Sequence, residues 1–137
     1  MDLPRMGQGT WHLGDQPAGR KEEIEAVREG IGLGLTMIDT AEMYGEGRAE
    51  SLVGEAIAGI PRESLYIVSK VYPHNAGRKN IFHSAENSLR RMKTDYMDLY
   101  LLHWRGGVPL CETVECMEEL KRRSLIRRFG VSNFDTH

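Results

Sequence analysis

The chain alternates short apolar runs with segments in which apolar residues recur every three or four positions. The runs predict β-strands over residues 35–39, 65–70, 96–103 and 129–133, and a short strand with its following loop over residues 6–11. The helical spacing predicts amphipathic α-helices over residues 20–33, 49–57, 81–92 and 114–120. Because strand and helix alternate strictly, the pattern predicts an α/β fold with a parallel sheet and outer helices.

Polar residues close the apolar runs at regular distances. The residues at or beside four predicted strand ends lie 29 to 33 positions apart: Asp39, Lys70, His103 and Ser132. A βα unit of a (β/α)8 barrel takes about 31 residues, and an open flavodoxin-like sheet has units of similar length, so the period fits both. A barrel gathers every strand end around one mouth, which favours a partial (β/α)8 TIM barrel. We expect about four βα units plus a fifth strand, in one domain spanning residues 1–137.

The composition limits what the protein is expected to bind. A formal net charge of -2 and a pI ≈ 6.2 give no electrostatic attraction to nucleic acid or to an anionic membrane. No apolar run approaches the roughly 20 residues of a membrane-spanning helix, and the N-terminus lacks a signal-peptide pattern. Cys111 and Cys116 lack the spacing of a metal site. We therefore expect a cytoplasmic protein without a metal, nucleic-acid or membrane partner.

Four motifs, in order along the chain, resemble those of the aldo-keto reductase family. They are Gly34–Ala41 followed by Tyr44, Val68–Lys70, Leu101–Trp104 and Gly130–Phe134. The loops at residues 44–50 and 70–77 are most similar to bacterial members that reduce methylglyoxal and similar aldehydes. Because a (β/α)8 barrel needs about 250 residues, the likeness is to the N-terminal half only, as in a truncated aldo-keto reductase domain.

The resemblance implies a catalytic tetrad for NADPH-dependent carbonyl reduction. Hydride addition leaves an alkoxide that must be protonated, and free tyrosine, with a pKa of about 10, needs help to donate that proton. Tyr44 would be the proton donor, supported by the ammonium of Lys70. Asp39 would keep Lys70 charged and oriented, and His103 would orient the carbonyl oxygen.

Each of these four residues has a simpler explanation when considered alone. Asp39 and Lys70 would form a structural ion pair, and Tyr44 would be a half-buried packing residue. His103 would be a buried histidine with satisfied hydrogen bonds. The motif context and the expected convergence at one mouth favour the catalytic interpretation.

The resemblance also implies residues that contact the cofactor. Gly9, Thr10 and Trp11 match the loop near the nicotinamide ribose, where Asp39 also lies, and Ser132 and Asn133 match positions that bind the nicotinamide carboxamide. Taken without the motif, Ser132 and Asn133 would simply cap a turn. In the family, the clamp for the cofactor's phosphates lies on strands beyond the fifth.

Three functional hypotheses remain open at this stage. The first is a reductase of small carbonyl compounds that uses NADPH, with the natural substrate and the preference over NADH undetermined. The second is a non-catalytic subunit or binding module of the same family. The third is an inactive fragment whose unpaired sheet edges promote self-association.

Overall fold

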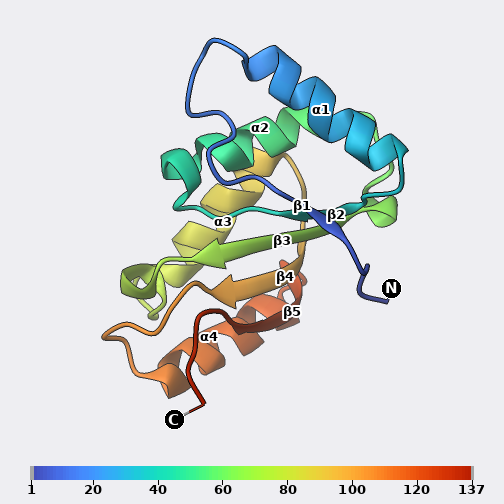
Figure 1. Ribbon diagram of the computed structural model, residues 1–137. Coiled ribbons are helices and arrows are strands. Elements are labelled where there is room, and N and C mark those ends of the chain that lie inside the picture. The colour runs from blue at the N-terminus through green and yellow to red at the C-terminus, as the bar shows by residue number, and fades with distance from the viewer. Residues whose placement is uncertain (1, 137) are drawn as a thin grey trace.

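The computed structural model describes residues 2–136, in which five strands alternate with four α-helices (Figure 1). The strands are β1 (Gly7–Gly9), β2 (Met37–Asp39), β3 (Tyr66–Val71), β4 (Met97–Leu102) and β5 (Ile126–Val131). The α-helices are α1 (Arg20–Gly32), α2 (Arg48–Ala56), α3 (Ile81–Met92) and α4 (Leu110–Arg122). Short 3-10 helices are η1 (Tyr44–Gly47), η2 (Arg62–Ser64) and η3 (Pro73–Asn75). The predicted α/β class is confirmed.

The five strands form one parallel sheet in the order β1-β2-β3-β4-β5. Every strand therefore pairs with the next one along the chain. A flavodoxin-like sheet reverses its strand order at a switch point, whereas a (β/α)8 barrel never does. The topology thus decides between the two alternatives in favour of a partial barrel.

The hydrophobic core lies between the sheet and the helices. Side chains that alternate along the strands, among them Ile38, Ile67 and Tyr100, are fully buried together with Leu52 and Leu120 from the helices. Burying a side chain of this size contributes roughly 1.5–3 kcal/mol. The helices pack against this face of the sheet (Figure 1). The apolar stripes in their sequences are the surfaces that they bury there. The longest described helices have 13 residues, and none between residues 2 and 136 is long and apolar enough to cross a membrane.

The boundaries of some elements differ from the prediction. The fifth strand was expected at residues 129–133, but β5 starts at Ile126 and ends at Val131, so Ser132 and Asn133 follow the strand. Consecutive charges at Arg127 and Arg128 hide its first half from pattern recognition. Pairing with β4, which aligns Met97 with Ile126, imposes the extended backbone there. Within residues 6–11, predicted as a short strand with its following loop, β1 covers Gly7–Gly9.

Candidate active site

Three neighbouring strands deliver polar side chains to one edge of the sheet. Asp39 ends β2, Lys70 is the next-to-last residue of β3, and His103 directly follows β4. The strands are parallel, so their carboxyl ends share one edge, which we call the mouth. The register pairs Asp39 with Val68 and Lys70 with Leu101. Because residues two apart on a strand share a face, the three polar side chains lie on the side opposite the helices.

The Lys70 ammonium joins the groups at the mouth. Lys70 is buried, and its Nζ donates hydrogen bonds to Asp39 Oδ1 at 2.5 Å, to the Thr40 carbonyl at 2.9 Å and to the Tyr44 phenol oxygen at 3.2 Å. An ammonium has three N–H donors, and each has an acceptor here. The Asp39 side chain remains 46% exposed, so one charge of the pair is still hydrated.

Tyr44 reaches Lys70 because the chain turns sharply after β2. Three residues that follow Tyr44 have left-handed backbone: Gly45 at φ 60°, Glu46 at φ 52° and Gly47 at φ 92°. Glycine at two of these positions lowers the cost of that conformation. The Tyr44 phenol oxygen accepts a hydrogen bond from Lys70, which leaves the phenol's own proton free to point elsewhere.

His103 places a buried imidazole beside Tyr44. The two rings meet edge to face at 80°, with centroids 5.8 Å apart, and the His103 backbone N–H donates to the Val71 carbonyl at 3.1 Å. Burial lowers the pKa of His103 below 6.5, with a further contribution from the Lys70 charge that Asp39 opposes. The imidazole is therefore neutral at pH 7 and carries one ring N–H for donation.

The lowered pKa of His103 predicts a pH dependence of stability. A histidine with a depressed folded-state pKa stabilises the fold above its unfolded pKa of about 6.5, and this contribution is lost as pH falls through the folded value. Between about pH 7.5 and about pH 5, we expect the wild-type chain to lose more unfolding free energy than His103→Gln. Urea denaturation at both pH values measures the difference. Equal losses in the two proteins would show that His103 is not the group responsible.

The residues predicted near the nicotinamide ribose lie around the end of β1. Thr10 is fully buried and donates from its backbone N–H and its hydroxyl to the Asp39 carbonyl, at 3.0 Å in both cases. Gly9 pairs with Asp39, and a Cβ placed there would meet no atom within 4 Å. Trp11 stacks on His12 and is 66% exposed. Gly9 and Thr10 therefore lie beside Asp39, whereas the Trp11 side chain stacks on His12 and is largely exposed.

Ser132 and Asn133 lie beside the chain segment that carries His103. The Ser132 backbone N–H donates to the Leu102 carbonyl at 2.9 Å, and Asn133 Nδ2 donates to the His103 carbonyl at 3.0 Å. Asn133 adopts left-handed backbone at φ 56°, which turns the chain after β5. Besides any contact with a ligand, Asn133 therefore ties β5 to the end of β4.

The sequence patterns assigned no role to three polar residues next to the mouth, Glu42, Tyr72 and Asn75. Glu42 is 7% exposed and accepts hydrogen bonds from both others. The Tyr72 hydroxyl donates to Glu46, and burial followed by this interaction raises the pKa of Tyr72 to about 12. The only hint in the sequence is an acid two residues before Tyr44.

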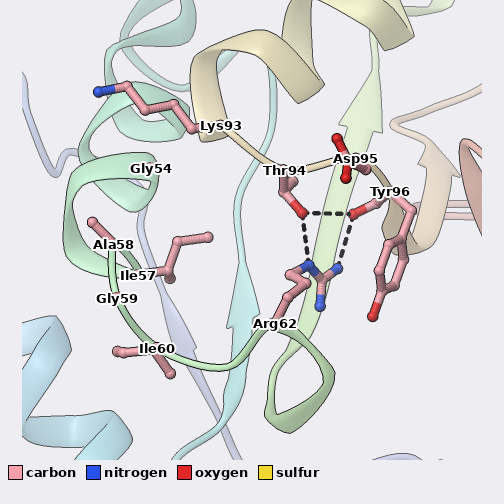
Figure 2. A pocket seen from close by; sticks show the side chains of 10 residues that line it. All are labelled: Gly54, Ile57, Ala58, Gly59, Ile60, Arg62, Lys93, Thr94, Asp95 and Tyr96. Carbon is pink, nitrogen blue, oxygen red and sulfur yellow. Dashed lines mark hydrogen bonds between the residues drawn. The ribbon is translucent and has the colours of Figure 1, made fainter.

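A hollow of about 410 Å³ lies at the opposite end of the sheet (Figure 2). Arg62 crosses it and donates hydrogen bonds to the Thr94 hydroxyl at 2.8 Å, to the Tyr96 carbonyl at 2.9 Å and to Asp98 at 2.7 Å. These partners occupy the guanidinium, so its role is to join the segments that precede β3 and β4. Barrel enzymes carry their chemistry at the carboxyl ends of the strands, which excludes this end as the site.

The described part of the chain lacks the usual constellation of metal ligands. Within residues 2–136, no group of three or more His, Cys, Asp or Glu side chains could hold a metal ion. Cys111 is exposed and Cys116 buried, and both are free.

Comparison with known proteins identifies a family and several relatives of this chain. A family model described as the aldo/keto reductase family matches residues 5–137. The chain belongs to this family. Among aldo/keto reductase relatives, methylglyoxal reductase YeaE of Escherichia coli (strain K12) is 56% identical over 135 residues, covering 98% of this chain and 47% of the relative. Aldo-keto reductase YhdN of Bacillus subtilis (strain 168) is 39% identical, covering 98% and 44%.

Solved aldo-keto reductase structures superimpose closely on this chain. An aldo-keto reductase from Klebsiella pneumoniae, crystallised with NADPH, has a TM-score of 0.95 and 56% identity, covering 98% of this chain and 47% of its own. The thermostable aldo-keto reductase Tm1743, crystallised with the inhibitor epalrestat, has a TM-score of 0.94 and 46% identity, covering 98% and 51%. The chain thus spans about half the length of the relatives it matches.

Proposed function

We propose that this chain carries the acid–base residues of an NADPH-dependent reductase that converts aldehydes and ketones, such as methylglyoxal, to alcohols. The observation that carries the proposal is the contact of one buried ammonium, Lys70, with both Asp39 and the Tyr44 phenol oxygen. A structural ion pair needs no phenol in this position. The family membership and the methylglyoxal reductases among the relatives support the substrate class.

The residues at the mouth have complementary roles in this reaction. Bound NADPH would supply the hydride to the carbonyl carbon. The neutral His103 donates a ring N–H to the carbonyl oxygen and orients it, and the Tyr44 phenol protonates that oxygen as negative charge develops. The Lys70 ammonium stabilises the resulting phenolate, which then takes a proton from water, and Asp39 holds the ammonium in place.

The nicotinamide end of the cofactor fits the residues around the mouth. Gly9 leaves its face of β1 open, since a Cβ there would meet nothing within 4 Å. Ser132 and Asn133 offer a hydroxyl and an amide next to His103. We propose that Gly9, Thr10, Trp11, Asp39, Ser132 and Asn133 line this end of the cofactor.

The activity test is NADPH oxidation with methylglyoxal, followed by loss of nicotinamide absorbance. We expect turnover that depends on both compounds and that Asp39→Asn reduces. A non-catalytic binding module would give no oxidation while still binding a partner protein. Absence of oxidation at high NADPH, from a chain whose cooperative unfolding shows that it is folded, would reject catalysis by this chain.

We expect this chain to bind NADPH far more weakly than relatives of twice its length. The resemblance assigns the clamp for the pyrophosphate and the 2'-phosphate to later strands, and the described residues contain none after β5. Phosphate contacts are charge-assisted and strong, so their loss is costly. Fluorescence titration of NADPH measures the dissociation constant, and micromolar or tighter binding would contradict the expectation.

We also propose that copies of the chain associate through the sheet edges. β1 and β5 are the outer strands and leave backbone donors and acceptors unpaired along the sheet. Arg127 and Arg128 on β5 are exposed, and two copies that paired along β5 would bring these like charges close together. We therefore expect association to increase with salt, which screens this repulsion. Analytical ultracentrifugation at low and high salt tests this; a 15.5 kDa monomer at both would oppose it.

The proposed location of the protein is the cytoplasm. Both cysteines are free, and one of them, Cys111, is exposed on α4. Unpaired thiols are typical of proteins in reducing compartments. The proposed partners are small carbonyl compounds, without nucleic acid.

A further inference from the structure

The pairing of β2 with β3 continues past the ends of the regular ladder. Asp39 pairs with Val68, and beyond it the Thr40 N–H donates to the Val68 carbonyl at 2.9 Å and the Glu42 N–H donates to the Lys70 carbonyl at 3.3 Å. In a parallel pair the next rung would run from the N–H two residues after Lys70 to the main-chain carbonyl of Glu42.

That next rung is made by a side chain instead. The Tyr72 N–H donates to Glu42 Oε1 at 2.9 Å. Asn75 Nδ2 donates to the same oxygen at 3.0 Å, and Glu42 is 7% exposed. The Glu42 carboxylate therefore takes the place that its own backbone carbonyl would occupy in a continuing ladder. The main chain of Glu42 can therefore leave the sheet, because the Tyr72 N–H still has an acceptor in the Glu42 side chain.

The departure of the main chain at Glu42 is what brings Tyr44 over the mouth. The turn closes at once, with the Tyr44 N–H donating to the Ala41 carbonyl at 3.2 Å and the Glu46 N–H donating to the Met43 carbonyl at 3.1 Å. A strand that continued in register would carry residue 44 away along β3. The turn instead returns the Tyr44 side chain to the Lys70 ammonium.

We propose that Glu42 is a positioning residue for the reaction: its side chain ends the β2–β3 ladder and sets the Tyr44 phenol against Lys70. This inference rests on the proposed function, because it concerns the same proton donor. Glu42 touches neither the Lys70 ammonium nor the Tyr44 phenol, so it acts through the backbone of two loops.

The contacts require an acceptor oxygen rather than a charge. Both donors meet Oε1, and burial raises the pKa of Glu42 above 4.5 against the opposing hydrogen bonds. A glutamine side chain presents a carbonyl oxygen in the same place, whereas leucine has a similar size and no acceptor. Glu42→Gln and Glu42→Leu therefore form a matched pair. Glu46→Ala is the control on the same loop, because it removes the exposed hydrogen bond to the Tyr72 hydroxyl.

The kinetic test compares these variants in NADPH-dependent methylglyoxal reduction. For Glu42→Leu we expect kcat to fall by about 100-fold with the affinity for NADPH unchanged, because a misplacement of about 1 Å has that effect on a reacting group. Glu42→Gln and Glu46→Ala should stay within about threefold of wild type. Retained kcat in Glu42→Leu, or an equal loss in Glu42→Gln, would overturn the proposal.

A second readout does not depend on turnover, so it separates this proposal from the proposed function. Carbon-13 at Cζ of tyrosine reports the hydrogen bonding of each phenol, and Tyr44→Phe assigns the Tyr44 signal. Lys70→Met should shift that signal in the wild-type background and leave it unchanged in Glu42→Leu, where the contact is already lost. A shift of the same size in both backgrounds would overturn the proposal even if the chain shows no activity.

Hydrogen exchange in the wild-type chain keeps the proposal testable should Glu42→Leu fail to fold. The Tyr72 amide lies beyond β3, and its acceptor is the Glu42 side chain. We expect this amide to be protected as strongly as that of Val71 within the strand. An unprotected Tyr72 amide would show that the Glu42 carboxylate does not replace the backbone carbonyl as its acceptor, and would contradict the proposal.

Discussion

Replacing Tyr44 with phenylalanine is expected to lower kcat/KM for methylglyoxal reduction by roughly 10²- to 10⁴-fold, the usual contribution of a positioned general acid. The substitution removes one oxygen and keeps the ring beside His103. Binding of NADPH should be unchanged, since the phenol is proposed to act on the carbonyl oxygen. Steady-state kinetics together with a fluorescence titration of NADPH measure the two quantities separately.

Tyr72→Phe is the matched control for this experiment. Its phenol also lies near the mouth but donates to Glu46 and makes no contact with Lys70. We expect the control to retain activity within about threefold. If Tyr44→Phe retained activity as well as Tyr72→Phe does, the phenol next to Lys70 would not be the proton donor.

The second large effect is expected on stability, from Arg91→Leu. Glu50 is fully buried behind β3, and Arg91 donates to its Oε1 from Nε at 3.0 Å and from Nη2 at 2.7 Å. Without Arg91 the carboxylate keeps one side-chain partner, the Ser69 hydroxyl at 2.9 Å. Leaving a buried charge without its counterion costs about 3 to 5 kcal/mol. Urea denaturation should show this loss of unfolding free energy.

Two control variants separate the buried charge from other causes. The double variant Glu50→Leu/Arg91→Leu should recover much of the loss, because apolar replacement of a buried ion pair is often neutral. Arg20→Leu removes a partly exposed partner of Glu55 and should cost less than about 1 kcal/mol. If Arg91→Leu lost no more unfolding free energy than Arg20→Leu, the buried Glu50 carboxylate would not depend on Arg91 as its counterion.

The two predictions concern opposite faces of the same strand. Lys70 points to the open side of β3, and its neighbour Ser69 points to the helices, where Glu50 and Arg91 meet. Arg91 also lies against Gly47, since a Cβ on that glycine would come within 2.7 Å of the arginine side chain. The ion pair of Glu50 and Arg91 thus packs against the turn that carries Tyr44, on the helix side of the sheet.

Residues at strand ends were predictable from the pattern of the chain. Asp39 and His103 each lie at the carboxyl end of an apolar run, and parallel strands bring their carboxyl ends to one edge of the sheet. Lys70, which closes the apolar run over residues 65–70, is the third such residue. The structure brings these residues and Tyr44 together as expected, while Trp11 extends into solvent.

Other features depended on neighbours far along the chain. The first half of β5 carries Arg127 and Arg128, which no strand pattern predicts, and only the pairing of Ile126 with Met97 makes it extended. The role of Glu42 depends on the hydrogen bond that it accepts from the Tyr72 N–H, and Tyr72 lies 30 positions away in the sequence. A local pattern cannot contain such a relation.

The amino-acid sequence by itself determined the alternation of strand and helix, the direction of each strand and the residues at its end, because these follow from local apolar periodicity and short motifs. Only the tertiary structure decided that the strands keep their sequential order, that Glu42 replaces a backbone acceptor, and that Lys70 Nζ touches Tyr44 and Asp39 together. Those outcomes depend on the register and on packing between distant segments, which are fixed by contacts across the sheet rather than by neighbours in the chain.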